Sequence, residues 1–184
     1  MADFVSQHSY LLSQIFGFAA MATAISMYQF KRHRTVMLLM VLCSSLWCVH
    51  YAFLGLLSPI LMNLVNVVRN FVCSFREKKW CQSAAIPVFF ILLTVVLSIV
   101  SWTGPECLLT LTASAFATVS CWMTDPKKLR CFTYPVCIGW FTYNFINHSI
   151  AATCNEAFTF VSVTVALVRF RLAEKKAKEP TAEE

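Results

Sequence analysis

The chain has 184 residues, of which 58% are hydrophobic and 13% carry a charge. That charged fraction is about half of what a soluble domain carries, so the composition indicates a membrane protein. Seven spans of ~20 residues would use about 140 positions, and the remainder is too short for a Rossmann fold or another soluble catalytic domain. We therefore expect a single membrane domain over residues 1–184, with its function inside the helix bundle.

Seven apolar segments follow one another along the chain, and turn residues such as Gly104-Pro105 or clusters of basic residues separate them. Residues 172–184, which follow the seventh apolar segment, are rich in charge, and we expect them to be a mobile cytoplasmic tail. We place the seven spans at 10–30, 35–56, 58–75, 83–102, 106–123, 130–147 and 149–171.

All but one of the 15 Lys and Arg residues fall into four clusters, and two predicted spans separate each cluster from the next. The clusters therefore share one face of the membrane, which the positive-inside rule makes cytoplasmic. This predicts an outside N-terminus and a cytoplasmic C-terminus. Topology and anionic lipid account for the net charge of +6, so we expect no nucleic-acid partner. The clusters begin at Lys31, Arg76, Lys127 and Arg169.

The sequence contains an internal repeat. AAMATA at residue 19 matches SAFATV at an offset of 95, LWCVHY at residue 46 matches GWFTYN at 93, and Asn63 matches Asn155 at 92. The first three spans (10–76) thus resemble the last three (106–171), and the span at 83–102 has no counterpart. Because one linker helix separates two three-helix halves, both halves cross the membrane in the same direction. The predicted fold is all-α, with a 3+1+3 arrangement of two parallel repeats.

These features resemble the SWEET, semiSWEET and PQ-loop superfamily, in which a linker helix joins three-helix halves. The resemblance rests also on a Gln and basic residues after the first span, and on a mid-span Trp followed 16 to 19 residues later by a polar residue. The segments FLGLLSPILMNLVNVVRN and LRCFTYPVCIGWFTYNFINHSIAATCNEAF are similar to YgjV-type bacterial inner-membrane proteins. This sequence departs from the PQ-loop pattern at Met27-Tyr28-Gln29 and Met123-Thr124-Asp125-Pro126, where Pro-Gln is usual. The resemblance implies a fold and an inner-membrane location, but no particular cargo.

Two charged residues lie inside predicted spans. Arg69 lies ~16 Å from the outer turn and Glu156 ~10 Å, at 1.5 Å per residue. They belong to equivalent helices that would face each other across the central axis. Arg69 could snorkel to the cytoplasmic face, or pair with Glu156 and fix how the halves pack. An unpaired Glu156 could instead bind a ligand or carry a proton.

Other polar residues surround this pair. Asn63, Asn66, Arg69 and Asn70 lie along one side of a helix, and they could line a site or hold the bundle together by hydrogen bonds. A mid-span Trp packs in the core or forms a flat wall for a ligand. His50 could bond a ligand, gate by pH or cap a neighbour. The candidate binding residues are Trp47, Asn66, Trp140, Asn144, Asn155 and Glu156, and the candidate coupling or gating residues are His50, Arg69 and Glu156.

No enzymatic or metal-binding motif occurs in the sequence, so we expect no enzyme, no cofactor and no metal. One hypothesis is a multi-pass plasma-membrane carrier or facilitator for a sugar or another small polar metabolite, with a midplane site. The alternative is a non-transporting assembly or sensing protein with the same fold. A water-accessible cavity bounded by Asn66, Trp140 and Glu156 would favour the carrier, and a filled core the alternative. The expected partners are the lipid bilayer and a small polar solute, and the sequence leaves a homo-oligomer open.

Overall fold

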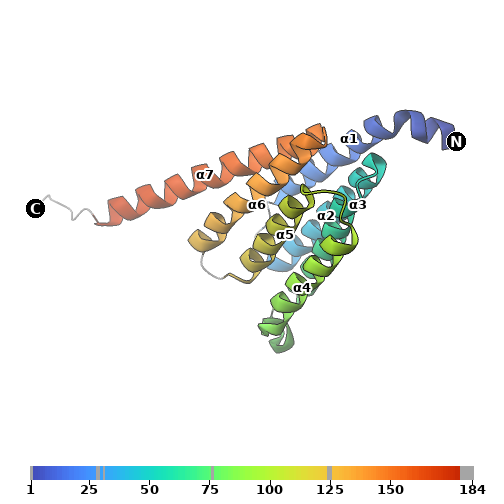
Figure 1. The fold of residues 1–184 in the computed structure, drawn as a ribbon. Coiled ribbons are helices and arrows are strands. Elements are labelled where there is room, and N and C mark those ends of the chain that lie inside the picture. Colours follow the sequence, from blue (N-terminus) through green and yellow to red (C-terminus); the bar gives the residue numbers. More distant parts are fainter. Residues whose placement is uncertain (1, 28–29, 31, 76, 124–125, 179–184) are drawn as a thin grey trace, which may run out of the picture.

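The computed structural model describes residues 2–27, 30, 32–75, 77–123 and 126–178, which form an all-helical bundle without strands (Figure 1). Each of the seven predicted spans coincides with one α-helix of the described chain. A short 3-10 helix, η2 (Lys79–Gln82), precedes the fourth α-helix. The α-helices are α1 (Ala2–Ser26), α2 (His33–Leu54), α3 (Leu57–Cys73), α4 (Ala85–Val100), α5 (Cys107–Trp122), α6 (Pro126–Ile146) and α7 (Ile150–Lys178).

Three of these helices are long and apolar enough to cross a membrane, with candidate spans at His8–Ser26, Arg34–Leu54 and Ile150–Leu172. Helices α3, α4 and α5 are also apolar but shorter, with 17, 16 and 16 residues. The sequence therefore predicted the positions of the helices well, although only some of them satisfy the length of a full span.

The surface of α4 shows the distribution of a helix in lipid. Its outward face consists of large apolar side chains, and Ile99 and Val100 are 68% and 71% exposed. Its inward face carries Phe90, Thr94 and Ser98, which are buried at helical spacing. A soluble helix would show the opposite arrangement, with polar residues outside. The helix is suited to contact lipid on one side and the bundle on the other.

Helices α1 and α7 extend beyond the candidate spans, His8–Ser26 and Ile150–Leu172, for which the sequence predicted 10–30 and 149–171. The predicted mobile tail begins at 172, but α7 continues to Lys178. Ala, Glu and Lys in this stretch are strong helix formers, and basic residues near a helix C-terminus interact favourably with its dipole. Helix α1 likewise begins at Ala2, before the predicted start at residue 10. Residues 179–184, and Tyr28, Gln29, Thr124 and Asp125 of the two departures from the PQ-loop pattern, lie outside the described residues.

The turns after α2 and α6 have the same geometry. Gly55 has a φ of 69°, and the Leu56 N–H donates to the carbonyl of Tyr51 (3.1 Å). His148 has a φ of 52°, and the Ser149 N–H donates to the carbonyl of Asn144 (2.9 Å). Each residue of the second turn lies 93 positions after its counterpart, so the sequence repeat is also a repeat of backbone conformation. Glycine adopts this left-handed conformation readily, whereas His148 is an uncommon residue there.

Helix contacts follow the same pattern. Helix α2 packs between α1 and α3, and α6 packs between α5 and α7. The two groups meet where α3 contacts α5 and where α1 contacts α7, and α4 packs against α3 and α5 at the edge of the bundle (Figure 1). We call the end that carries Gly55 and His148 the turn end. The opposite end, where Arg34, Lys79 and Arg130 lie, is the basic end.

Gly139 lets α5 and α6 approach closely. A Cβ atom at this position would lie 2.9 Å from the backbone oxygen of Leu109 and 3.0 Å from the Cβ of Ala113. Backbone and an alanine methyl cannot move aside as the end of a long side chain can. The position therefore requires glycine for packing rather than for backbone conformation.

We expect Gly139→Ala to destabilise the protein by about 1–3 kcal/mol, the range for overpacking a tight interface. The sign is diagnostic, because Gly→Ala in an unhindered helix interior is stabilising by about 1 kcal/mol. Thermal unfolding of the purified variant in detergent micelles measures the effect. A melting temperature above that of the wild type would contradict the close approach of α5 and α6.

Candidate functional site

A cavity of about 190 Å³ lies between the two groups of helices. Residues from α2, α3, α5, α6 and α7 line it, together with Met27 just after α1. It extends from the level of Tyr51 toward the basic end, where Met27 and Met40 contribute. Five of the candidate binding and coupling residues line this cavity, namely Trp47, Asn66, Arg69, Trp140 and Glu156. Asn63 and Asn70, from the same predicted polar face of the helix, line it as well.

Aromatic rings form one part of the cavity wall. The Tyr51 and Trp140 rings stack with centroids 6.2 Å apart and an interplanar angle of 25°. The Trp47 and Tyr51 rings lie 6.0 Å apart. Trp47 and Trp140 are both buried, so each packs in the core and also contributes to the wall. The two alternatives that the sequence left open for these residues are therefore compatible.

Arg69 is only 3% exposed. Its Nη1 donates to the hydroxyl of Thr118 on α5 (3.0 Å), and its Nη2 lies 3.5 Å from Oδ1 of Asn70. The Nε atom is buried and has no hydrogen-bond partner. No acidic side chain of the described residues forms an ion pair with the guanidinium. Arg69 is thus a buried cation held by neutral groups alone, and it links α3 to α5.

Glu156 lies on the other side of the cavity, on α7. The amide of Asn155 donates to its Oε1 (3.1 Å), and no Lys or Arg among the described residues pairs with it. The ion pair between Arg69 and Glu156, one alternative at the sequence level, is therefore not formed in this structure. Glu156 also lines a second, mostly apolar groove of about 320 Å³ between α6 and α7, beside Cys137, Phe141 and Phe160.

Hydrogen bonds between helices close the turn end of the cavity. The hydroxyl of Tyr51 donates to Oδ1 of Asn144 (2.8 Å). His50 Nδ1 lies 2.6 Å from the carbonyl oxygen of Ser13, and its Nε2 lies 2.8 Å from the hydroxyl of Ser149. Because a carbonyl only accepts, Nδ1 carries a proton, and in the neutral tautomer Nε2 accepts from Ser149. These bonds join α2 to α1, α6 and the start of α7.

Gly17 allows this closure. A Cβ atom there would lie 2.6 Å from the Cβ of Ala151 and 2.8 Å from Nδ1 of His50. The backbone N–H of Ala151 donates to Oε1 of Gln14 (2.9 Å), and the hydroxyl of Tyr10 donates to the carbonyl of His148 (3.2 Å). Helices α1 and α7 therefore touch at the turn end, and they are tied there by hydrogen bonds.

Three candidate residues do not line the cavity. His50 and Asn144 belong to the closure at the turn end, where His50 is fully buried and Asn144 is 1% exposed. Asn155 supports Glu156 from outside. Helix α3 begins at Leu57 and α7 at Ile150, 93 residues apart, so Asn63 corresponds to Glu156 rather than to Asn155. A shift of one residue rotates a side chain by ~100° around a helix, which turns Asn155 away from the cavity.

Sequence reasoning missed several residues of the site and its closure. Tyr51 follows Trp47 by one helical turn, which was the available signal for its place in the wall. The roles of Ser13, Thr118 and Ser149 depend on contacts between distant segments, and the sequence carried no signal for them. Among the described residues, no group of three or more His, Cys, Asp and Glu side chains could hold a metal ion.

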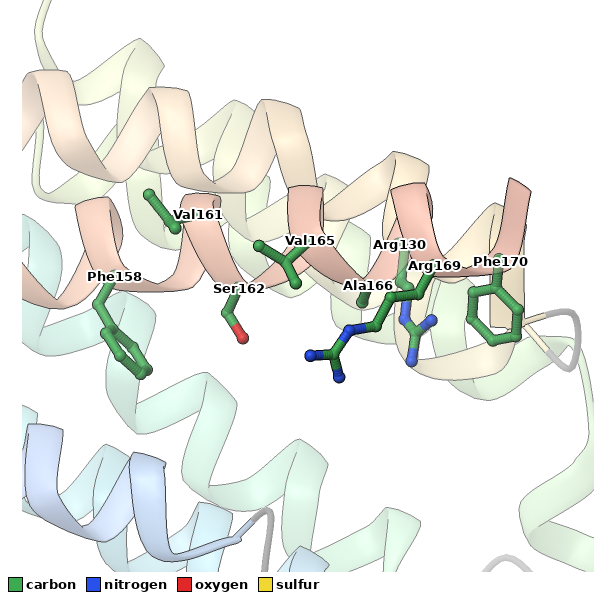
Figure 2. Close-up of a pocket in the computed structure, with 8 residues that line it drawn as sticks. All are labelled: Arg130, Phe158, Val161, Ser162, Val165, Ala166, Arg169 and Phe170. Atoms are coloured by element: carbon green, nitrogen blue, oxygen red, sulfur yellow. The ribbon is translucent and has the colours of Figure 1, made fainter. Parts of the chain in front are cut away.

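A larger hollow, of about 660 Å³, follows the C-terminal half of α7 toward the basic end. Figure 2 shows the side chains of Arg130 and Arg169 close together beside Phe170. The guanidinium of Arg130 lies over the Phe170 ring, 4.4 Å from its centroid. The remaining lining is mostly apolar and includes Phe158 and Val165. Two cations at the end of an apolar strip suit the headgroup and chain of an anionic lipid.

The Imp-YgjV family model, described as bacterial inner membrane protein, matches residues 11–174. The chain belongs to this family. No curated protein and no solved structure matches it. As an Imp-YgjV protein, the chain is located in the bacterial inner membrane, which agrees with its membrane-spanning helices. The apolar outer surfaces of this Imp-YgjV protein therefore contact the lipid bilayer.

The absence of an ion pair between Arg69 and Glu156 has a consequence for the free energy of unfolding of variants at these positions. Because the two residues share a cavity but form no ion pair, we expect the costs of Arg69→Met and Glu156→Gln in the Imp-YgjV protein to couple by about 0.5–1 kcal/mol in the double variant, at the low end for residues that share a cavity. Removing Arg69 leaves the Thr118 hydroxyl satisfied, because it also donates to the carbonyl of Ser114 (2.9 Å). Chemical unfolding of the four proteins in micelles measures the coupling.

The opposite result has a distinct signature. If the two residues formed a buried ion pair, either single substitution would cost about 3–5 kcal/mol, and the double variant would recover much of that loss. Such a recovery would show that the two charges pair in the folded protein in the membrane mimetic.

Proposed function

We propose that this Imp-YgjV protein is a SWEET-like carrier or facilitator that binds a small polar metabolite between its two halves. The observation that carries the proposal is the cavity itself, because polar and charged side chains from both halves line it. Its lining includes Asn66, Trp140 and Glu156. A cavity bounded by these three residues is the feature that we expected of a carrier from the sequence. The proposed role is binding and translocation, without an enzymatic step.

A parallel arrangement of two three-helix repeats, with α4 as the linker, supports this proposal. Tyr51 and Asn144 occupy equivalent positions, 93 residues apart, and they are hydrogen-bonded to each other. Residues related by a two-fold axis can touch only if they lie near that axis. The helix contacts agree, since the contact of α1 with α7 is the counterpart of that of α5 with α3.

The hydrogen bonds suggest which end opens. At the turn end, hydrogen bonds of Tyr10 and Gln14 join α1 to α7 and to the turn that precedes α7. The cavity, in contrast, reaches Met27 and Met40 toward the basic end, and α7 projects beyond the other helices at its C-terminal end (Figure 1). We therefore assign this conformation to a state closed at the turn end. Transport would require the bonds of Tyr51 and His50 to break as the basic end closes.

A thermal-shift screen of metabolites on the purified protein tests the carrier. A solute at 100 times its Kd stabilises the folded state by about 2.7 kcal/mol. Ala117 lines the cavity, so Ala117→Phe should fill it and abolish the shift. The matched control is Ala19→Phe on an exposed face of α1, which should keep the shift. The same solute should then enter proteoliposomes that contain the wild type.

Failure of this test is also informative. If no metabolite shifts the wild type, or if Ala117→Phe responds like Ala19→Phe, the cavity is not a solute site. The alternative, a non-transporting assembly or sensing protein that uses the same fold, would then be favoured.

The proposal includes a topology with the N-terminus outside, the turn end facing the periplasm and the basic end facing the cytoplasm. The positive-inside rule supports it, because all described Lys and Arg residues except Arg69 lie at or beyond the basic ends of the helices. Reporter fusions after residue 80 and at the C-terminus should give cytoplasmic signals. A periplasmic signal from residues 76–80 would refute this orientation.

A further inference from the structure

The cavity contains one side chain of each charge. Among the described residues of its lining, Arg69 is the only basic one and Glu156 the only acidic one. The two do not pair within the described chain, and each is held by neutral groups. A buried charge without a counter-ion is costly in a low-dielectric interior. The cavity therefore offers two separate ionic sites to a ligand.

Arg69 has unused capacity for an anion. A guanidinium has five N–H donors in a planar fork that matches a carboxylate. In this structure one donor bonds Thr118 closely, the contact to Asn70 is long at 3.5 Å, and Nε has no partner. A ligand carboxylate at this place would supply the missing acceptor and neutralise the charge.

Glu156 has the matching capacity for a cation. A carboxylate accepts through two oxygens at about four lone-pair sites, and the Asn155 amide and the Cys137 thiol occupy two of them. Oδ1 of Asn66 is a second acceptor without a donor. Asn66 lines the cavity, and this oxygen is buried and has no hydrogen-bond partner. An ammonium group has three donors and could bond the lone pairs of Glu156 that remain free.

We propose that the solute is a small zwitterion, whose carboxylate binds Arg69 and whose ammonium group binds Glu156. This inference rests on the proposed function, since it names the solute class of the same cavity. A neutral sugar would leave both charges without a counter-ion, and a simple anion or cation would leave one. The volume of about 190 Å³ is below the range of drug-sized pockets, so the solute is small. The rings of Trp47 and Trp140 suit a short apolar body.

The positions of the two charges along the membrane normal constrain the ligand further. Arg69 lies ~18 Å from the start of α3 and Glu156 ~9 Å from the start of α7, at 1.5 Å per residue. Both helices start at the turn end. The two Cα atoms are therefore offset by ~9 Å along the helix axes. Zwitterions with different charge separations should therefore differ in affinity.

The experiment measures the melting temperature of the purified full chain with three probes of increasing charge separation: L-valine, 4-aminobutyrate and 6-aminohexanoate. Each probe is compared with its amide, which lacks the carboxylate, and with its hydroxy acid, which lacks the ammonium group. D-glucose is the neutral comparison. We expect at least one zwitterion to stabilise the protein, and both of its singly charged analogues to bind at least ~10-fold more weakly, as expected for the loss of a charge-assisted contact.

Variants assign each end of the ligand. Arg69→Met should bind the zwitterion no better than its amide, and Glu156→Gln no better than its hydroxy acid. The matched controls are Arg171→Met and Glu77→Gln, which change exposed side chains outside the cavity and should retain the wild-type preference. The comparison of probes on the wild type decides the proposal even if a cavity variant does not fold.

Two results would overturn the proposal. If glucose or a singly charged analogue stabilises the wild type as well as the zwitterion does, the solute class is wrong, while the carrier itself stands. If none of the three zwitterions stabilises the wild type, the solute class is again wrong. The metabolite screen with Ala117→Phe then decides separately whether the cavity binds any solute.

Discussion

The structure depends on one constraint, which is that lipid offers no hydrogen bonds to polar side chains. Many serine, threonine and asparagine side chains consequently face the interior, whereas threonines that are not buried, such as Thr112 and Thr142, donate to the backbone carbonyl four residues earlier. The outer surface of α4 is made of large apolar residues. Interior polar groups then have to satisfy one another, as Tyr51 and Asn144 do. Two atoms that remain without a partner, Nε of Arg69 and Oδ1 of Asn66, belong to residues that line the cavity. The same physical rule thus explains both the packing and the polar lining of the candidate site.

The helices could be predicted from the sequence because lipid imposes a simple pattern. Apolar stretches, turn residues such as Gly55 and basic clusters each have a direct physical meaning in a membrane. The helical continuation of α7 beyond residue 171 was not predicted, since helix-forming charged residues such as Lys175 and Lys176 look like a tail by charge but favour helix by propensity. Charge indicates on which side of the membrane a segment lies, and it says little about whether the segment is helical.

The candidate site was predicted in part, for a geometric reason. Trp47, Asn66, Arg69, Trp140 and Glu156 line one cavity. Helical spacing explains why Asn66 and Arg69 share a face of α3, and the packing of α2, α6 and α7 around that face brings the other three residues to it. His50 and Asn144 share that polarity, but their side chains bond Ser149 and Tyr51 at the turn end. Whether a buried polar residue faces a cavity or a partner depends on the neighbouring helix. A single sequence does not specify those neighbours.

In the proposed arrangement of two repeats, having both halves in one chain lets equivalent positions differ. Residue 93 places after Asn63 is Glu156, and residue 93 places after Arg69 is Ser162, so each charge has a neutral counterpart. An assembly of two identical halves would carry both charges twice, and like charges would then crowd a cavity of about 190 Å³. Like charges close together in a low dielectric disfavour ionisation. A fused chain avoids this repulsion, and it gives the cavity a direction, with a positive side and a negative side, that a symmetric dimer could not have.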